Sequence, residues 1–147
     1  MGRRILVVED DAQLQVLASR VLTTYGYEPR IAADGKEAQR LAAEDPPPEL
    51  VLMDLALPDY DGLEVTRWLK AANPRLVVIA VSAHAMASDR DRARAAGCDG
   101  FLTKPYQIDQ LIEVVRHALG ESAPVDSPRS AAGAPPVDAV PPKPSST

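Results

Sequence analysis

Apolar residues in this chain gather in short unbroken runs, each followed by a longer stretch with helical spacing. The clearest run is Leu50–Asp54, in which four apolar residues precede one aspartate. A run without polar alternation is typical of a strand buried on both faces of a parallel sheet. Further strands are predicted at residues 4–8, 28–33, 76–81 and 101–103.

The stretches after these strands carry apolar residues three and four positions apart, as amphipathic helices do. Asp11 is placed to cap the first helix and Gly26 to end it. Asp34 and Gly35 open the second helix, and three prolines at 46–48 end it. The helical residues predicted to face the core are Leu14, Leu17, Ala18, Val21, Leu22, Ala38, Leu41, Ala42, Val65, Trp68, Leu69, Ala72, Ile108, Leu111, Ile112, Val115 and Leu119.

Five strands alternating with five helices predict an α/β domain, in which a parallel sheet carries helices on both faces. Right-handed crossovers bring the carboxyl end of every strand to one edge of that sheet. We predict the strand order 2-1-3-4-5 of flavodoxin-like folds, which makes strands 1, 3, 4 and 5 consecutive neighbours about 4.8 Å apart.

The alternating pattern ends near residue 120. Residues 121–147 hold seven of the 14 prolines and contain no leucine, isoleucine or aromatic residue. Such a segment cannot bury enough apolar area to offset the entropy lost on ordering. We therefore predict one domain at 1–120, followed by a disordered tail or linker at 121–147.

Charge and composition exclude several classes of function. The formal net charge of −5 argues against a nucleic-acid-binding surface, which needs basic stripes. The chain shows no signal peptide and no apolar run long enough to cross a membrane. The single cysteine, Cys98, has no intramolecular disulfide partner, so we expect a cytoplasmic protein in which Cys98 is structural.

Polar residues follow four of the five predicted strands. Glu9 and Asp10 end the first, Asp54 the third, Ser82 the fourth, and Lys104 follows the fifth. Asp54 taken alone would equally suit a capped turn, but the neighbouring strands deliver acids and a base to the same edge, where open α/β sheets place their ligands.

Three carboxylates at one edge would repel each other strongly unless a divalent cation lay among them. Hard oxygen ligands that leave room for water and phosphate suit Mg²⁺. A hydroxyl and an ammonium opposite them match the remaining oxygens of a phosphoryl group. A central carboxylate such as Asp54 could then act as nucleophile and form an acyl phosphate.

Six short motifs appear together in the order and spacing of one known family. They are Val7-Val8-Glu9-Asp10-Asp11, Met53-Asp54, Leu57-Pro58, Asp61-Gly62, Ser82-Ala83 and Lys104-Pro105. With these motifs, residues 4–119 resemble the receiver domain of two-component response regulators. The stretches 83–87 and 95–99 are further similar to receivers of hybrid kinases and of single-domain cell-cycle regulators.

The resemblance implies a phosphorylation-activated regulator in a phosphorelay. Asp54 would accept phosphate from a histidine kinase or a histidine phosphotransfer protein, with Mg²⁺ as cofactor. Asp10, Asp54 and the backbone carbonyl of Ala56 would hold the metal, and Glu9 would act through a bound water. Ser82 would donate a hydrogen bond to the phosphoryl group.

The same resemblance assigns roles around the last strand. Lys104 would pair with the phosphoryl group, and the bond between Lys104 and Pro105 would be cis. Phe101 matches the aromatic residue whose rotamer couples to the hydroxyl residue, here Ser82. Together these residues would switch an output face formed by helix 4, strand 5 and helix 5, which binds a partner protein.

Two further pairs of residues are assigned by position. Ala56 and His84, each two residues past a site residue, would flank the water path, and the resemblance implies that these two positions tune dephosphorylation. His84 would equally suit a solvated loop. Leu14 and Pro105 are candidates for docking the kinase. We expect no direct contact with nucleic acid or membrane.

Three alternatives to this function remain open. The first is an adaptor of the same fold that binds partners without phosphate. The second is an aspartate-nucleophile phosphatase acting on external substrates, which needs a second acid where the chain has Ala56. We therefore predict no enzyme beyond phosphoryl transfer to, and hydrolysis from, its own Asp54. The third is that this receiver is a portion of a longer multidomain protein.

Overall fold

The computed structural model describes residues 2–121, which form one parallel sheet of five strands in the order β2-β1-β3-β4-β5. This is the flavodoxin-like order predicted from the sequence. The strands are β1 (Arg4–Val8), β2 (Glu28–Ala32), β3 (Leu50–Asp54), β4 (Val77–Ser82) and β5 (Gly100–Thr103). The helices are α1 (Ala12–Thr24), α2 (Gly35–Ala42), α3 (Gly62–Ala72), α4 (Ala87–Ala95) and α5 (Ile108–Ala118).

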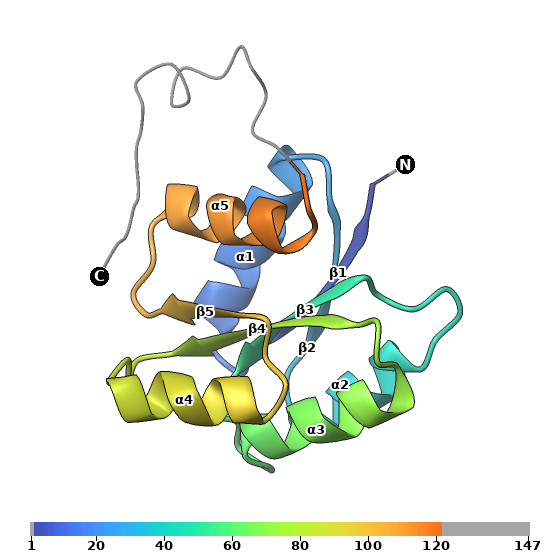
Figure 1. The fold of residues 1–147 in the computed structure, drawn as a ribbon. Coiled ribbons are helices and arrows are strands. Elements are labelled where there is room, and N and C mark those ends of the chain that lie inside the picture. The colour runs from blue at the N-terminus through green and yellow to red at the C-terminus, as the bar shows by residue number, and fades with distance from the viewer. Residues whose placement is uncertain (1, 122–147) are drawn as a thin grey trace.

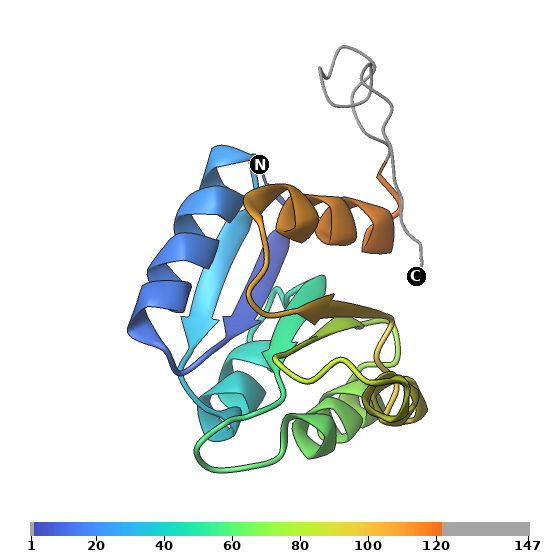
Figure 2. The ribbon, with the colours of Figure 1, turned by 90° about the vertical axis from the view of Figure 1, so that its left-hand side faces the viewer.

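The helices cover the sheet in two layers. Helices α1 and α5 lie on one face, and α2, α3 and α4 lie on the other (Figures 1 and 2). Every residue of β3 is buried, as expected of a central strand that packs helices on both sides. The central position of β3 therefore brings its last residue, Asp54, to the middle of the carboxyl edge.

Local signals set the ends of the helices. The side chains of Asp11, Asp34 and Asp61 accept hydrogen bonds from backbone N–H groups in the first turns of α1, α2 and α3. Gly26 and Gly97 follow α1 and α4 with φ of 91° and 106°, a left-handed conformation that favours glycine at a helix end.

The structure corrects two predictions made from helical spacing. Ile108, predicted to face the core, is 47% exposed, because α5 meets the core only from Leu111, one turn later. Ala72, predicted on the buried face of α3, is exposed in the last turn of that helix, beyond Leu69. In both cases the helix extends past the apolar surface that it covers.

The folded unit reaches one residue beyond the predicted boundary at 120. Glu121 accepts hydrogen bonds from the hydroxyl of Tyr27 at 2.7 Å and from Arg3 Nη1 at 2.8 Å. The remainder of the predicted tail, 122–147, lies outside the described residues. Among the helices of residues 2–121, none is long and apolar enough to cross a membrane.

Candidate functional site

Three carboxylates lie together at the carboxyl edge of the sheet. Glu9, Asp10 and Asp54 each offer an oxygen, and these oxygens lie within 4.8 Å of one another. Glu9 and Asp54 are only 5% and 3% exposed, whereas Asp10 faces solvent. We call these three residues the acid cluster.

Strand register explains why the acid cluster forms. Val8 of β1 lies opposite Met53 of β3, so the next residues of the two strands, Glu9 and Asp54, emerge side by side. The chain is then held in place at Glu9, whose carbonyl accepts a 2.6 Å hydrogen bond from the side-chain amide of Gln15 on α1. The acid cluster is therefore a direct product of the pairing between β1 and β3.

Lys104 is the cation that faces the acid cluster. Its Nζ lies 2.9 Å from Glu9 Oε1 and 3.1 Å from Asp54 Oδ2. The other oxygen of Asp54 accepts the backbone N–H of Ala56 at 2.9 Å. Both oxygens of the Asp54 carboxylate are thus oriented by neighbours that come from different elements.

The pKa values at this edge reflect burial and crowding. Burial raises the pKa of Glu9, and the nearby charge of Asp54 raises it further, against the lowering effect of bonds from Lys104 and the Asp11 N–H. Burial lowers the pKa of Lys104, but its contacts with Glu9 and Asp54 outweigh burial and raise it overall. The ammonium of Lys104 is therefore held in its charged form.

The donor set of the acid cluster fits a hard divalent cation. Three carboxylates face one ammonium, so an excess of negative charge remains in a largely buried place. Carboxylate and carbonyl oxygens are the ligands that such cations prefer. The acid cluster could therefore hold a metal ion.

Ser82 and Lys104 meet across the last two strands. Ser82 pairs in register with Thr103, and its carbonyl accepts the N–H of Lys104 at 2.8 Å. Ser82 is 8% exposed, and its hydroxyl accepts a hydrogen bond from the N–H of His84 at 3.0 Å. The side chain of His84 is exposed, and the Lys104-Pro105 bond is cis.

The loop between β3 and α3 carries Ala56 and is fixed from two sides. Ala56 forms an antiparallel bridge with Asp61 inside the loop. Asp59 reaches across to the start of α2, where its two oxygens accept the N–H groups of Gly35 and Lys36 at 2.9 and 3.0 Å. These bonds hold the backbone of Ala56 at the edge of the acid cluster.

The other predicted residues lie around this centre and not in it. Phe101 is half-buried on β5, where its register partner is Ala80. Leu14 is half-buried in the first turn of α1, and Pro105 is exposed after β5. The structure therefore separates a compact acid-and-lysine centre from a surrounding rim.

Sequence reasoning missed several residues that support the site. Tyr106 is half-buried and packs against the hydrophobic core, and its pKa is raised by burial and then by the charge of Glu9. Its signal was its place directly after the Lys104-Pro105 motif. Asp59 and Gln15 had no comparable signal, since each bonds to a partner on another segment.

A parallel sheet with acids and a lysine at its carboxyl edge is characteristic of α/β proteins that bind an anionic ligand at that edge. The family model of the response regulator receiver domain matches residues 5–116. The chain belongs to this family: it is a phosphorylation-activated regulator of two-component signalling, and members of the family are generally not classical enzymes.

Individual relatives agree with this assignment. The chain is 38% identical over 124 residues to the polar-differentiation response regulator DivK of Brucella anthropi, covering 83% of this chain and 100% of the relative. A CheY-like receiver from Methanospirillum hungatei matches with a TM-score of 0.75 and 28% identity, over 82% of this chain and 95% of that one. Chemotaxis protein CheY4 of Vibrio cholerae, at 22% identity over 80% of this chain and 99% of that one, shares the fold with a TM-score of 0.76.

Proposed function

We propose that Asp54 is the phosphoacceptor of this receiver and takes its phosphoryl group from a phosphohistidine on a histidine kinase or a histidine phosphotransfer protein. The observation that carries this assignment is the position of Asp54. It is buried at the centre of the carboxyl edge, beside the acids that follow β1 and the ammonium of Lys104. A carboxylate so placed meets a phosphorus atom while cationic groups take up the phosphoryl charge.

The residues of the site divide the work of phosphoryl transfer. An oxygen of Asp54 attacks phosphorus, the bond from phosphorus to the histidine nitrogen breaks, and an acyl phosphate forms. Lys104 pairs with one phosphoryl oxygen, and the hydroxyl of Ser82 turns to donate a hydrogen bond to another.

Asp10, Asp54 and the carbonyl of Ala56 would hold Mg²⁺, with Glu9 acting through a water. When bound, the ion supplies positive charge that offsets the carboxylates and the incoming phosphoryl group.

Phosphorylation switches a partner-binding face through Ser82. Movement of Ser82 toward the phosphoryl group displaces its register partner on β5, and Phe101, two residues before that partner, follows inward. The face formed by α4, β5 and α5 is thereby biased between two conformations, one of which binds an output protein.

The same site limits the lifetime of the signal. Hydrolysis needs a water in line with phosphorus, and Ala56 and His84 flank that approach. Ala56 offers no side-chain group to hold the water, so self-dephosphorylation is slow. An aspartate phosphatase acting on external substrates would require an acid at position 56, and the chain lacks one.

Two surfaces and one boundary complete the proposal. Leu14 and Pro105 form part of the docking surface for the phosphohistidine partner. Residues 1–120 act as the receiver, to which Glu121 is bonded, and the rest of 121–147 acts as a tail or as a linker to a further part of the protein. A phosphate-independent adaptor is less well supported, because no residue of the phosphorylation chemistry is replaced.

Intact-mass measurement after incubation with acetyl phosphate and Mg²⁺ tests the proposal. The chain should gain one phosphate, and Asp54→Asn should gain none. Asp91→Asn is the matched control, since Asp91 is an exposed aspartate on α4 whose ion pair is with Arg94, away from the acid cluster. A full phosphate increment on the Asp54→Asn protein would contradict the assignment.

A further inference from the structure

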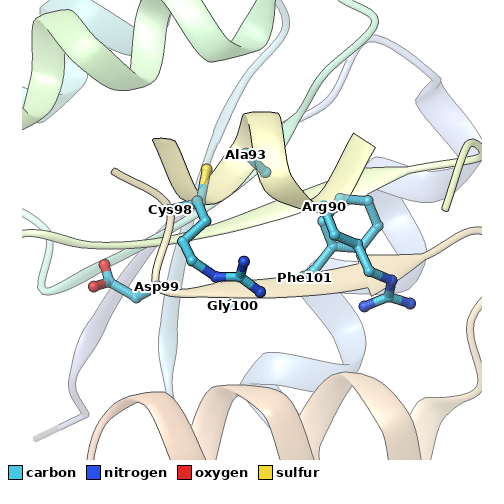
Figure 3. Close-up of a pocket in the computed structure, with 7 residues that line it drawn as sticks. Arg90, Ala93, Cys98, Asp99, Gly100 and Phe101 are labelled. Carbon is cyan, nitrogen blue, oxygen red and sulfur yellow. The ribbon is translucent and has the colours of Figure 1, made fainter. Parts of the chain in front are cut away.

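A pocket of about 220 Å³ opens between α4 and β5, separate from the acid cluster (Figure 3). Arg90 and Phe101 lie at one end of it and Asp99 at the other, with Cys98 between them. Arg94 and Ala93 complete the α4 side of the pocket. Its wall is thus partly apolar, and two guanidinium groups stand at its margin.

The charges of this pocket leave it positive. The carboxylate of Asp99 is already neutralised, since it accepts hydrogen bonds from Lys70 Nζ at 2.8 Å and from the N–H of Val78 at 2.9 Å. Arg94 is itself paired with Asp91 at 3.1 Å, so Arg90 is the cation of the pocket that no carboxylate of residues 2–121 compensates. In a chain of net charge −5, a positive pocket of this kind is suited to a negative group from outside.

Arg90 differs from the other arginines of α4. Arg92 and Arg94 each bond an aspartate three residues earlier on the helix, at 2.8 and 3.1 Å. Within residues 2–121, no carboxylate pairs with Arg90. Its guanidinium carbon instead lies 4.7 Å from the centre of the Phe101 ring, a cation–π contact.

Arg90 also touches the part of β5 that borders the phosphorylation site. Its Nη2 lies 3.5 Å from the hydroxyl of Thr103, and Thr103 is the register partner of Ser82. Phe101 and Thr103 are two residues apart, so they present their side chains on the same face of the strand. A displacement of β5 at Thr103, opposite Ser82 of β4, therefore reaches Arg90 through both of its contacts.

We infer that the α4–β5 pocket binds an acidic side chain of the output protein, and that Arg90 makes this binding depend on the state of Phe101. In one state the guanidinium of Arg90 is held in the cation–π contact with the ring of Phe101. When the ring moves inward, Arg90 is free to form a charge-assisted hydrogen bond to the incoming carboxylate, next to Arg94. The inference rests on the proposed function, because the movement of Phe101 is driven by phosphorylation there.

Peptides selected from a displayed random library on the beryllofluoride-activated full chain with Mg²⁺ provide the probe. Each selected peptide is measured by fluorescence anisotropy beside a version with its Asp or Glu changed to the amide. The selected peptides should share an acid, and its amide version should bind about tenfold more weakly.

Variants of the chain locate the effect. The affinities of Arg90→Gln for the acidic and the amide peptide should agree within about twofold, because the cation that binds the carboxylate is gone. Arg92→Gln is the matched control on the same helix, outside the pocket, and should keep the full difference. Phe101→Leu removes the π face. Without beryllofluoride, this variant should bind the acidic peptide about two- to fivefold more tightly than the wild type does under the same conditions.

Each contrary result bears on a separate statement. The absence of a common acid, or an equal loss on Arg90→Gln and wild type, would overturn the inference even if Asp54 takes up phosphate normally. Equal acid binding with and without beryllofluoride, in a chain that is phosphorylated at Asp54, would overturn the coupling to Phe101. Failure of Asp54 to take up phosphate would overturn the proposed function instead. Intact-mass measurement would detect that failure without any peptide.

Discussion

At the carboxyl edge of the sheet three carboxylates face one lysine, whereas at the amino edge the charged groups are bonded to partners of complementary chemistry. We call Arg3, Tyr27, Glu49 and Glu121 the Arg3 cluster. Arg3 lies 2.8 Å from both glutamates, and the hydroxyl of Tyr27 donates to Glu121 at 2.7 Å. Burial alone would raise the pKa of Glu121, but its bonds from Tyr27 and Arg3 lower it overall.

The difference separates a functional edge from a structural one. Each polar group of the Arg3 cluster gains a partner on folding, so the cluster adds to the free energy of unfolding. The carboxylates of the acid cluster still repel one another in the folded chain. A bound cation can neutralise that repulsion and leave room for a phosphoryl group. Stability and binding capacity are therefore placed at opposite ends of the same strands.

The largest effect is expected at alkaline pH, where the Arg3 cluster loses its proton donor. Burial and the bond to Glu121 raise the pKa of Tyr27 from 10.0 to about 12. The neutral phenol is favoured in the folded state, so its contribution is complete below pH 10 and is lost as pH rises toward 12. The loss should be about 3 kcal/mol at most.

Urea unfolding of wild type and Tyr27→Phe across this pH range measures that loss. Cys98, whose pKa burial raises to about 11, titrates in the same range in both proteins, so the difference between them isolates Tyr27. Parallel pH profiles for the two proteins would show that the phenol does not hold the amino edge together.

Glu121→Gln should lower the free energy of unfolding by about 1–2 kcal/mol. The amide keeps the size of the side chain, but the charge that accepts bonds from Arg3 and Tyr27 is lost. Urea unfolding at neutral pH measures the effect, and Glu113→Gln, an exposed position on α5, is the control. An unchanged midpoint for Glu121→Gln would mean that the folded unit ends at 120 after all.

At the other edge, Ala56→Asn should shorten the life of the phosphorylated protein. An amide at this position can hold a water in line with phosphorus, which Ala56 cannot. One positioning hydrogen bond should speed the loss of phosphate about tenfold, or about 1.4 kcal/mol of barrier. Phosphoprotein decay followed by mass tests this, and equal or slower decay would refute the role given to position 56.

The smallest effect should have the opposite sign to that of Glu121→Gln. Asp10→Asn removes one of three crowded carboxylates, and should raise the free energy of unfolding without Mg²⁺ by about 0.5 kcal/mol. The same change should abolish most of the extra stability that Mg²⁺ gives the wild type. Thermal unfolding with and without Mg²⁺ measures both quantities. Destabilisation by Asp10→Asn in metal-free buffer would end the contrast between the two edges.

The features that short-range signals encode were predicted from sequence. Buried runs such as Leu50–Asp54 specify strands wherever they stand, and Asp11 caps a helix through bonds to residues two and three positions on. The order of the strands was predicted as that of flavodoxin-like folds, and the handedness of crossovers predicted that the carboxyl ends meet at one edge. The acid cluster was predicted because its members directly follow buried strands, so that the register of β1 and β3 alone brings Glu9 beside Asp54.

Contacts between distant segments were decided only by the tertiary structure. Asp59 bonds to an N–H 24 residues away, and Glu121 bonds to a side chain 118 residues away, with no local pattern to mark either partner. In the sequence nothing separates Arg90 from the other charged residues of α4. Only the packing of β5 against α4 brings the ring of Phe101 to its guanidinium. Ile108 fits the helical stripe and is nevertheless exposed, since burial depends on what a neighbouring element covers. Local sequence sets which conformation a segment adopts, but a side chain's partner depends on which surfaces meet when the segments pack.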